Sequence, residues 1–189
     1  MSVDVVRSTL GETIGLLERV READAAPLVK AAAAITEALK RGGTLLMFGN
    51  GGSASDAQHV ASELVNRFQR ERAALAAVAL TADTSVLTSI GNDYDFTRVF
   101  ARQVEALGRT GDVAFGISTS GKSANVAAAL DAARARGLQT VAMTGRDGGR
   151  VGRAAAIHIN VPSDVTARVQ EVHRTLLHVI CDLVERAFV

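Results

Sequence analysis

A chain of 189 residues, with 48% hydrophobic and 22% charged side chains, has the composition of a single globular domain that can bury a full core. A net charge of +1 argues against a nucleic-acid groove or an anionic membrane surface as a partner, and no apolar stretch approaches the roughly 20 residues that a bilayer span requires. The single cysteine, Cys181, excludes an internal disulfide and fits a reducing cytoplasm.

The first part of the chain predicts two helices. Over about 3–22, apolar side chains recur at spacings of three or four residues, which is typical of an amphipathic helix. An alanine-rich segment over about 24–40 ends at Gly42 and Gly43, where a helix can stop. We expect residues 1–42 to be a helical extension of a single domain, with apolar faces that suit either another subunit or the chain's own core.

From residue 43 to residue 189, short apolar runs alternate with helical patterns. The helices include one over about 53–70, and the last covers about 165–188. Five strands that alternate with helices predict an α/β fold, in which a five-stranded parallel sheet is sandwiched by helices and ligands bind beyond the carboxyl ends of the strands. The runs expected to be strands are 44–48, 76–80, 112–117, 139–143 and 156–161.

A cluster of hydroxyls follows the third expected strand and precedes a helix. Hydroxyls and free backbone N–H groups at a helix start form an anion site, whereas a helix cap needs only one hydroxyl. The glycine spacings of a P-loop and of a dinucleotide-binding loop are both absent. We therefore favour a compact phosphate, such as that of a sugar phosphate, over capping alone. The hydroxyls in the run Ser-Thr-Ser-Gly-Lys-Ser belong to Ser118, Thr119, Ser120 and Ser123.

A second loop, Gly-Asn-Gly-Gly-Ser at 49–53, follows the first expected strand. Its glycines let the backbone approach a ligand closely, and the amide of Asn50 can hydrogen-bond sugar hydroxyls. On the helix that follows, His59 and Glu63 are four residues apart and project from nearly the same face, as two ligands of one metal ion would. Taken alone, the loop is a tight turn and the pair is a surface His–Glu contact.

The closing helix carries two further candidate ligands, Gln170 and His178. They are eight residues apart, which is roughly 12 Å along a helix axis, whereas two ligands of one ion have donor atoms only a few ångströms apart. Two arrangements remain open at this point. Either Gln170 reaches along from the helix start, or the ligands come from different subunits.

Taken jointly, these motifs resemble those of the phosphoheptose isomerases, a family with the sugar isomerase (SIS), flavodoxin-like fold. One departure is that residues 163–167 lack an acid immediately before Arg168, which some relatives have near the pocket. The matching segments extend over nearly the whole chain, and they are 49–53 with His59 and Glu63, 91–93, 118–125, and 170–171 with His178.

The resemblance implies an activity and a set of residue roles. The activity is aldose–ketose isomerisation of sedoheptulose 7-phosphate to D-glycero-D-manno-heptose 7-phosphate, for bacterial lipopolysaccharide precursors, by a homotetramer with one zinc ion per subunit. Glu63 and His178 would transfer the protons through an enediol. The implied zinc ligands are His59, Glu63, Gln170 and His178. The implied substrate contacts are Asn50, Gly51, Gly52, Glu63, Asn92, Asp93, Ser118, Thr119, Ser120, Ser123 and Gln170.

Two alternatives compete with this function. A related tetrameric SIS protein binds the replication initiator DnaA, but such a binding module has no reason to hold both Glu63 and His178 in these places. The other alternative is an isomerase of a pentose or hexose phosphate, because the motif residues can bind a phosphate and a polyol but do not determine the number of carbons in the sugar.

The remaining polar residues have structural interpretations. We expect His158 to face solvent by strand alternation and His173 to lie behind the ligands or at an interface. Cys181 belongs to an apolar helix and is expected in the core. Three arginines near the end of the helix over about 53–70 are expected to form a solvated helix end, and they are Arg67, Arg70 and Arg72.

Overall fold

The computed structural model describes residues 2–189, so Met1, the first residue of the expected extension 1–42, lies outside the described residues. Five parallel strands form one sheet in the order β2-β1-β3-β4-β5. This topology confirms the predicted five-stranded parallel sheet, and its strand order is that of a flavodoxin-like fold. The strands are β1 (Leu45–Gly49), β2 (Ala77–Ala79), β3 (Val113–Ser118), β4 (Gln139–Gly145) and β5 (Ile157–Val161).

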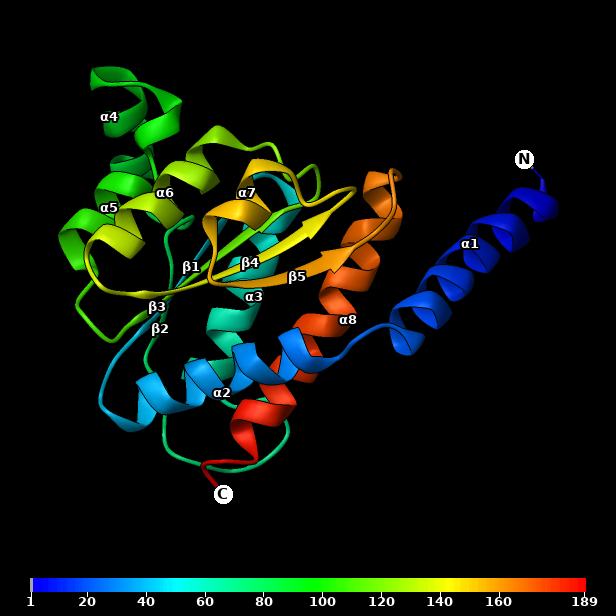
Figure 1. Ribbon diagram of the computed structural model, residues 1–189, viewed down its shortest axis with the longest axis horizontal. Coiled ribbons are helices and arrows are strands. Elements are labelled where there is room, and N and C mark those ends of the chain that lie inside the picture. The colour runs from blue at the N-terminus through cyan, green and yellow to red at the C-terminus, as the bar shows by residue number, and fades with distance from the viewer. Residues whose placement is uncertain (1) are drawn as a thin grey trace.

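Helices cover both faces of the sheet (Figure 1). None of the helices within residues 2–189 combines the length and the apolar character that a membrane span needs. One face carries α2 (Ala26–Lys40), α3 (Gly52–Val65) and α8 (Thr166–Glu185). The opposite face carries α4 (Thr84–Asp93), the 3-10 turn η1 (Phe96–Arg98), α5 (Ala101–Leu107), α6 (Ala124–Ala135) and α7 (Gly149–Ala154).

Strand alternation divides the core into two layers. In β3, Phe115 and Ile117 pack with α2, α3 and α8, whereas Ala114 packs with the helices of the opposite face. β1 lies beside β3 in parallel register, with Gly49 opposite Ile117. Both strands therefore end at the same edge of the sheet, and the two Gly/Ser loops start next to each other.

The two leading helices differ in their packing. α2 lies on the sheet, where Ala31 and Ile35 are buried. α1 (Val3–Glu22) projects from the body of the molecule (Figure 1), and it leaves Leu10 and Ile14 each 58% exposed. Of the two apolar faces, that of α2 is thus packed on the chain's own core, while α1 keeps an apolar stripe uncovered. The domain boundary at residue 42 stays a prediction.

α3 ends earlier than predicted. The helix expected over about 53–70 ends at Val65. Arg67 is exposed as expected, but the interpretation of Arg72 as part of a solvated helix end is wrong, because its side chain has no exposed surface. The cause is a tertiary contact, since the carboxylate of Glu185 on α8 binds the backbone of this segment. The side chain of Arg70 is likewise drawn toward α8 and is only 33% exposed.

The expectation that His158 faces solvent is also wrong. Its Nε2 lies 2.6 Å from Thr144 Oγ1, and its ring packs against Gly148 and Gly152. The reason is that α7 folds over β5, and these two glycines leave room for the imidazole. His173 is fully buried, with Nε2 3.0 Å from the carbonyl oxygen of Thr144. The buried position of Cys181 confirms its assignment to the core.

Candidate active site

A pair of amides joins the loops that follow β1 and β3. Asn50 Nδ2 donates to Asn125 Oδ1 at 2.9 Å, and Asn125 Nδ2 donates to Asn50 Oδ1 at 2.8 Å. Gly51, the next residue, has a φ of +56° and a ψ of −122°, a conformation that residues with a Cβ rarely adopt. The reciprocal bonds tie the Gly-Asn-Gly-Gly-Ser loop to the start of α6. Asn125 therefore belongs to the site, although the motifs alone assigned it no role.

Three of the four hydroxyls of the serine loop (residues 118–123) lie close to one another. Ser118 Oγ lies 2.9 Å from Ser123 Oγ and 3.5 Å from Ser120 Oγ. Ser123 is the N-cap residue of α6, yet its side chain makes no capping hydrogen bond. Converging hydroxyls at a helix start are what a bound phosphate needs. The hydroxyl-bearing residues of the loop are all buried or half-buried, and they are Ser118, Thr119, Ser120 and Ser123.

α3 and α8 bring three of the predicted metal ligands together. His59 Nε2 lies 2.8 Å from His178 Nε2 and 3.3 Å from Glu63 Oε1. One donor atom from each of the three residues lies within 4.8 Å of the other two, and all three side chains are half-buried. The histidine–glutamate pair on α3 is thus completed by an imidazole from 119 residues further along the chain.

The surroundings of His178 favour its neutral form. Desolvation lowers the pKa of His178, and the neighbouring His59 lowers it further, against the opposing effect of Glu63. The ring of Phe68 packs beside this imidazole, with ring centroids 5.5 Å apart. Because a neutral imidazole is the form that binds a metal ion, the lowered pKa of His178 favours metal binding at neutral pH.

α3 and α8 run parallel and in register along their lengths. In the first turn of α3, a Cβ on Gly52 would collide with the side-chain amide of Gln170. One turn further, Arg174 Nε donates to Oδ1 of the buried Asp56 at 2.6 Å, an offset of 118 residues. The histidine pair follows at an offset of 119 residues. A nearly constant offset of 118 to 119 residues is the property of two packed helices that run in the same direction.

This register separates Gln170 from the other predicted ligands. Gln170 lies over the start of α3 and lines a pocket with Asp56 and Arg174. Because a helix is rigid, Gln170 and His178 stay roughly 12 Å apart along α8. The role of Gln170 as a ligand stays a prediction. Asp56 was missed, although its position three residues before His59 on the same helix could have indicated a site residue.

Asn92 and Asp93, two predicted sugar contacts, lie at the C-terminal end of α4. Both side chains are exposed, and within the described part of the chain their side-chain hydrogen bonding is confined to the pair itself, at 2.9 Å. The helix that carries them covers the face of the sheet opposite α3 and α8 (Figure 1). Their contact with the sugar stays a prediction.

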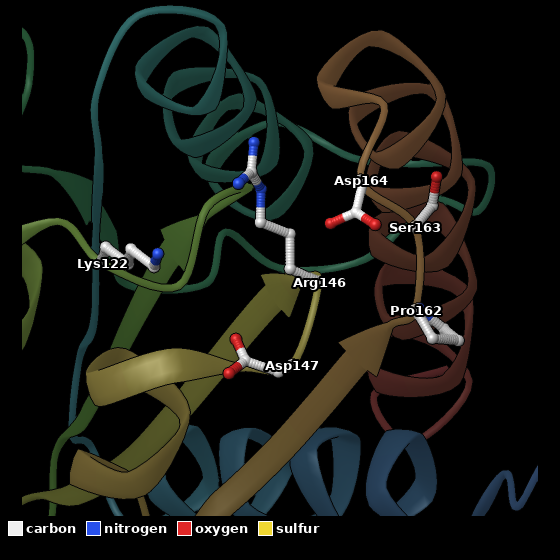
Figure 2. A pocket seen from close by; sticks show the side chains of 6 residues that line it. All are labelled: Lys122, Arg146, Asp147, Pro162, Ser163 and Asp164. Carbon is white, nitrogen blue, oxygen red and sulfur yellow. The ribbon is translucent and has the colours of Figure 1, made fainter.

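A pocket of about 460 Å³ opens beyond the carboxyl ends of β4 and β5 (Figure 2). Arg146 in its wall has a φ of +56°, and its N–H donates to the carbonyl oxygen of Ser163 at 3.1 Å. The pocket borders the serine loop through Lys122, but its charges are mixed and indicate no single ligand. The motifs did not predict it, because three separate loops form its wall. Its lining residues are Lys122, Arg146, Asp147, Pro162, Ser163 and Asp164.

Comparison with known proteins bears on the family. Residues 10–145 match the SIS domain. A phosphoheptose isomerase from a Roseiflexus species is 55% identical over 174 residues, which cover 92% of this chain and 88% of that protein. The structure of a phosphoheptose isomerase from Neisseria gonorrhoeae has a TM-score of 0.92 at 46% identity and covers 97% of this chain and 98% of that one. One from Francisella tularensis has a TM-score of 0.94 at 36% identity, with 98% and 99% covered.

These matches extend from the leading helices to α8, so they include both loops and the paired helices that carry the histidines. They confirm the resemblance that the motifs indicated. The chain therefore belongs to the phosphoheptose isomerase family of SIS-domain proteins and is a sugar-phosphate isomerase.

Proposed function

We propose that this chain converts sedoheptulose 7-phosphate to D-glycero-D-manno-heptose 7-phosphate, with a zinc ion held at the group formed by His59, Glu63 and His178. The observation that carries the proposal is the meeting of two imidazoles and a carboxylate from two helices, within 4.8 Å of one another. Relatives at 55% and 46% identity are named phosphoheptose isomerases, which supports the seven-carbon substrate. The product would supply heptose and lipopolysaccharide precursors in the cytoplasm.

The chemistry and spacing of the three residues fit zinc. Zinc binds imidazole nitrogen at about 2.0–2.1 Å in a tetrahedral arrangement, so two such nitrogens on one ion lie about 3.3 Å apart. The two imidazole Nε2 atoms are 2.8 Å apart, and His59 Nε2 is 3.3 Å from Glu63 Oε1. Only small movements are therefore needed to place the three donors around one ion. Zinc would supply Lewis acidity that polarises the substrate oxygens.

The serine loop would bind the phosphate of the substrate. The hydroxyls of Ser118, Ser120 and Ser123 converge at the start of α6, where backbone N–H groups also favour an anion. Gly121, at the tip of the loop, has a φ of +66° and packs against the backbone of Gly148, which fixes the shape of the loop. A phosphate held at this end would orient the carbon chain of the sugar.

Glu63 and His178 would move the proton between C1 and C2. The isomerisation needs a base for the carbon proton and an acid for the carbonyl oxygen, with an enediol between the two transfers. A carboxylate and a neutral imidazole in one half-buried group can fill these two roles. Glu63→Gln removes the proton acceptor with little change of shape, so we expect it to abolish nearly all isomerisation in a folded protein.

We further propose that the enzyme is a homotetramer whose sites are shared between subunits. The apolar stripe on α1 supports contact with another copy, since Val6, Leu10 and Ile14 are 58–59% exposed. The register of α3 and α8 supports sharing of the site. Gln170 and His178 lie roughly 12 Å apart along one helix, so a Gln170 that binds the same ion as His178 would come from a neighbouring subunit.

The substrate and the metal are tested on the purified protein. We expect about one zinc ion per chain by mass spectrometry, and the highest kcat/KM for the seven-carbon substrate among ketose phosphates of five to seven carbons. Glu105→Gln is the matched control for Glu63→Gln, because it removes a half-exposed carboxylate that pairs with Arg98 on the other face of the sheet. Negligible zinc with no turnover would favour a binding role such as that toward DnaA. A higher kcat/KM for a shorter sugar would favour another isomerase.

Shared sites are tested by mixing inactive variants. We expect Gln170→Ala and His59→Ala chains each to lose activity, and mixed oligomers of the two to regain part of it, because some sites then combine intact residues from both chains. A chain that carries both changes, mixed with an inactive partner, should regain none. Absence of recovery in oligomers shown to be mixed would contradict a site shared between subunits.

A further inference from the structure

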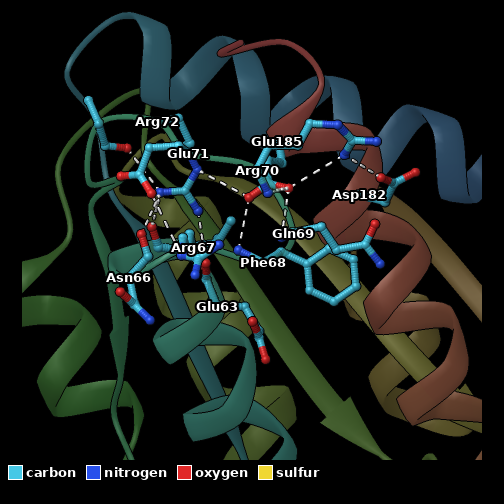
Figure 3. Close-up of polar contacts among 12 residues, drawn as sticks. Glu63, Asn66, Arg67, Phe68, Gln69, Arg70, Glu71, Arg72, Asp182 and Glu185 are labelled. Atoms are coloured by element: carbon cyan, nitrogen blue, oxygen red, sulfur yellow. Dashed lines mark hydrogen bonds and ion pairs between the residues drawn. The ribbon is translucent and has the colours of Figure 1, made fainter.

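A buried ion pair between Arg72 and Glu185, the Arg72–Glu185 lock, connects the segment after α3 with the C-terminal end of α8 (Figure 3). Neither side chain has any exposed surface, and Arg72 Nε lies 3.7 Å from Glu185 Oε1. Burying two charges is costly unless both are held by good partners. The groups that hydrogen-bond to Arg72 and to Glu185 therefore indicate the role of the pair.

Arg72 closes the end of α3. The last carbonyl groups of a helix have no partner within the helix. The guanidinium of Arg72 donates from Nη1 to the carbonyl oxygen of Leu64 at 2.8 Å and to that of Asn66 at 3.1 Å. Its Nη2 donates to the carbonyl oxygen of Glu63 at 2.8 Å. Arg72 thus holds the backbone of a proposed zinc ligand directly.

Glu185 holds the loop that follows α3. Its carboxylate accepts hydrogen bonds from the backbone N–H groups of Phe68, Gln69 and Arg70 at 2.8, 2.9 and 2.9 Å. Burial alone would raise the pKa of Glu185, but these N–H groups together with Arg72 hold it below its usual range. Figure 3 shows the three backbone donors converging on this one carboxylate, together with the guanidinium groups of Arg72 and Arg70, the latter with Nη1 3.4 Å from Oε2. The loop therefore has a fixed position relative to α8.

The lock also reaches His178. Glu185 follows His178 by seven residues on α8, which is close to two helical turns, so both residues lie on the same face. Phe68, whose N–H is held by Glu185, places its ring against the imidazole of His178. The lock therefore contacts a proposed ligand on α3 through Arg72 and the ligand on α8 through Phe68.

We propose that Arg72 and Glu185 are positioning residues that set the distance between the metal ligands of α3 and the ligand of α8. His59 and Glu63 belong to one helix and His178 to the other, so the group keeps its geometry only while the ends of the helices keep their separation. Without the lock, the end of α3 and the loop with Phe68 are released, and the two histidines move apart. The inference rests on the proposed metal site, but the spacing of the histidines is measurable without a metal.

The test compares metal-free and zinc-titrated forms of Glu185→Gln and wild type. The substitution keeps the shape of the side chain but removes its charge and one acceptor oxygen. We expect zinc affinity of the folded variant to fall about 10- to 100-fold, the range seen when groups that orient metal ligands are changed. In crystals of the metal-free variant, the Nε2 atoms of His59 and His178 should be further apart than 2.8 Å. Glu105→Gln, which breaks a half-exposed ion pair, should change neither quantity.

The outcomes separate this proposal from the proposed function. A Glu185→Gln protein that melts earlier, yet keeps wild-type zinc affinity and histidine spacing, would show the lock to be structural only and would overturn the proposal. If the wild type binds no zinc, the proposed metal function fails. The positioning role of the lock is then judged from the distance between His59 Nε2 and His178 Nε2 alone, which should be larger in the variant than in the wild type. If Glu185→Gln does not fold, Arg72→Lys replaces it under the same criteria, since lysine keeps the charge but lacks the planar guanidinium that donates to several carbonyl oxygens at once.

Discussion

Replacing Gly52 by alanine separates the stability of the fold from the position of Gln170. Gly52 opens α3, and its φ lies outside the left-handed region, so the backbone accepts alanine. The new Cβ would collide with the side-chain amide of Gln170. Because that amide ends a flexible side chain, it can turn away while the backbone stays in place. The substitution is therefore a way to displace Gln170 without changing Gln170 itself.

The two effects of Gly52→Ala differ in magnitude. Alanine is favoured over glycine in a helix by up to about 1 kcal/mol, and the loss of one amide contact costs about 0.5–1.5 kcal/mol. We expect the free energy of unfolding to stay within about 1 kcal/mol of wild type, which is a Tm shift of about 2–4 °C at most. If Gln170 binds the metal or the substrate, kcat/KM should fall at least about tenfold, or about 1.4 kcal/mol of transition-state stabilisation.

Gly51→Ala is the matched control at the neighbouring position. A Cβ there has nothing within 4 Å, but the φ of +56° strains any residue other than glycine. We expect this variant to lose about 1–3 kcal/mol of stability without a collision at Gln170. Urea unfolding and initial rates with sedoheptulose 7-phosphate measure both quantities. Wild-type kcat/KM and zinc affinity in a folded Gly52→Ala protein would refute the reasoning, because Gln170 would then not be needed in its place.

Three further predictions follow from buried groups. Ser118→Ala should raise the KM for the sugar phosphate about tenfold or more with less effect on kcat, since a hydrogen bond to a charged group contributes about 1.5–3 kcal/mol; an unchanged KM in steady-state kinetics would speak against the serine loop as the phosphate site. Burial raises the pKa of the Cys181 thiol to about 12, so Ellman's reagent should label it only after unfolding, and rapid labelling of the native protein would contradict its core position. The pKa of Glu185 is lowered in the folded state, so its stabilisation is present above its usual pKa and is lost as the pH falls through the folded value. The stability of wild type relative to Glu185→Gln in urea should therefore shrink from about pH 7 to about pH 3, and a constant difference would count against the charged lock.

The sheet and the serine loop were predictable because their signals are local. β1 and β3 are short apolar runs buried on both faces, and each ends at a glycine- and serine-rich loop. Parallel strands end at one edge of a sheet, so the two loops had to be neighbours once both strands were recognised. The direct bond between Asn50 and Asn125 needed the structure, since 75 residues separate them.

The end of α3 and the environment of His158 depend on distant contacts. Nothing in residues 66–70 stops a helix by itself, but Glu185, more than 110 residues away, binds the backbone N–H groups that a longer helix would have used. Strand alternation correctly places His158 on the side of β5 away from Ile157 and Ile159. α7 covers that side, and its glycines leave space for the ring. Patterns within one element report which side a residue faces, and not what covers that side.

Because of the register of α3 and α8, the identity of the metal ligands is linked to the oligomeric state. His59 and Glu63 become part of a site only because a second, parallel helix meets them at an offset of 119 residues. The same register holds Gln170 against Gly52. In this chain Gln170 therefore lies roughly 12 Å from His178 along α8, at the start of α3 and away from the three-residue group. If Gln170 is a zinc ligand supplied by a neighbouring subunit, as proposed, the active enzyme has to be an oligomer, and a fully active monomer would contradict that sharing while leaving the three-residue group intact.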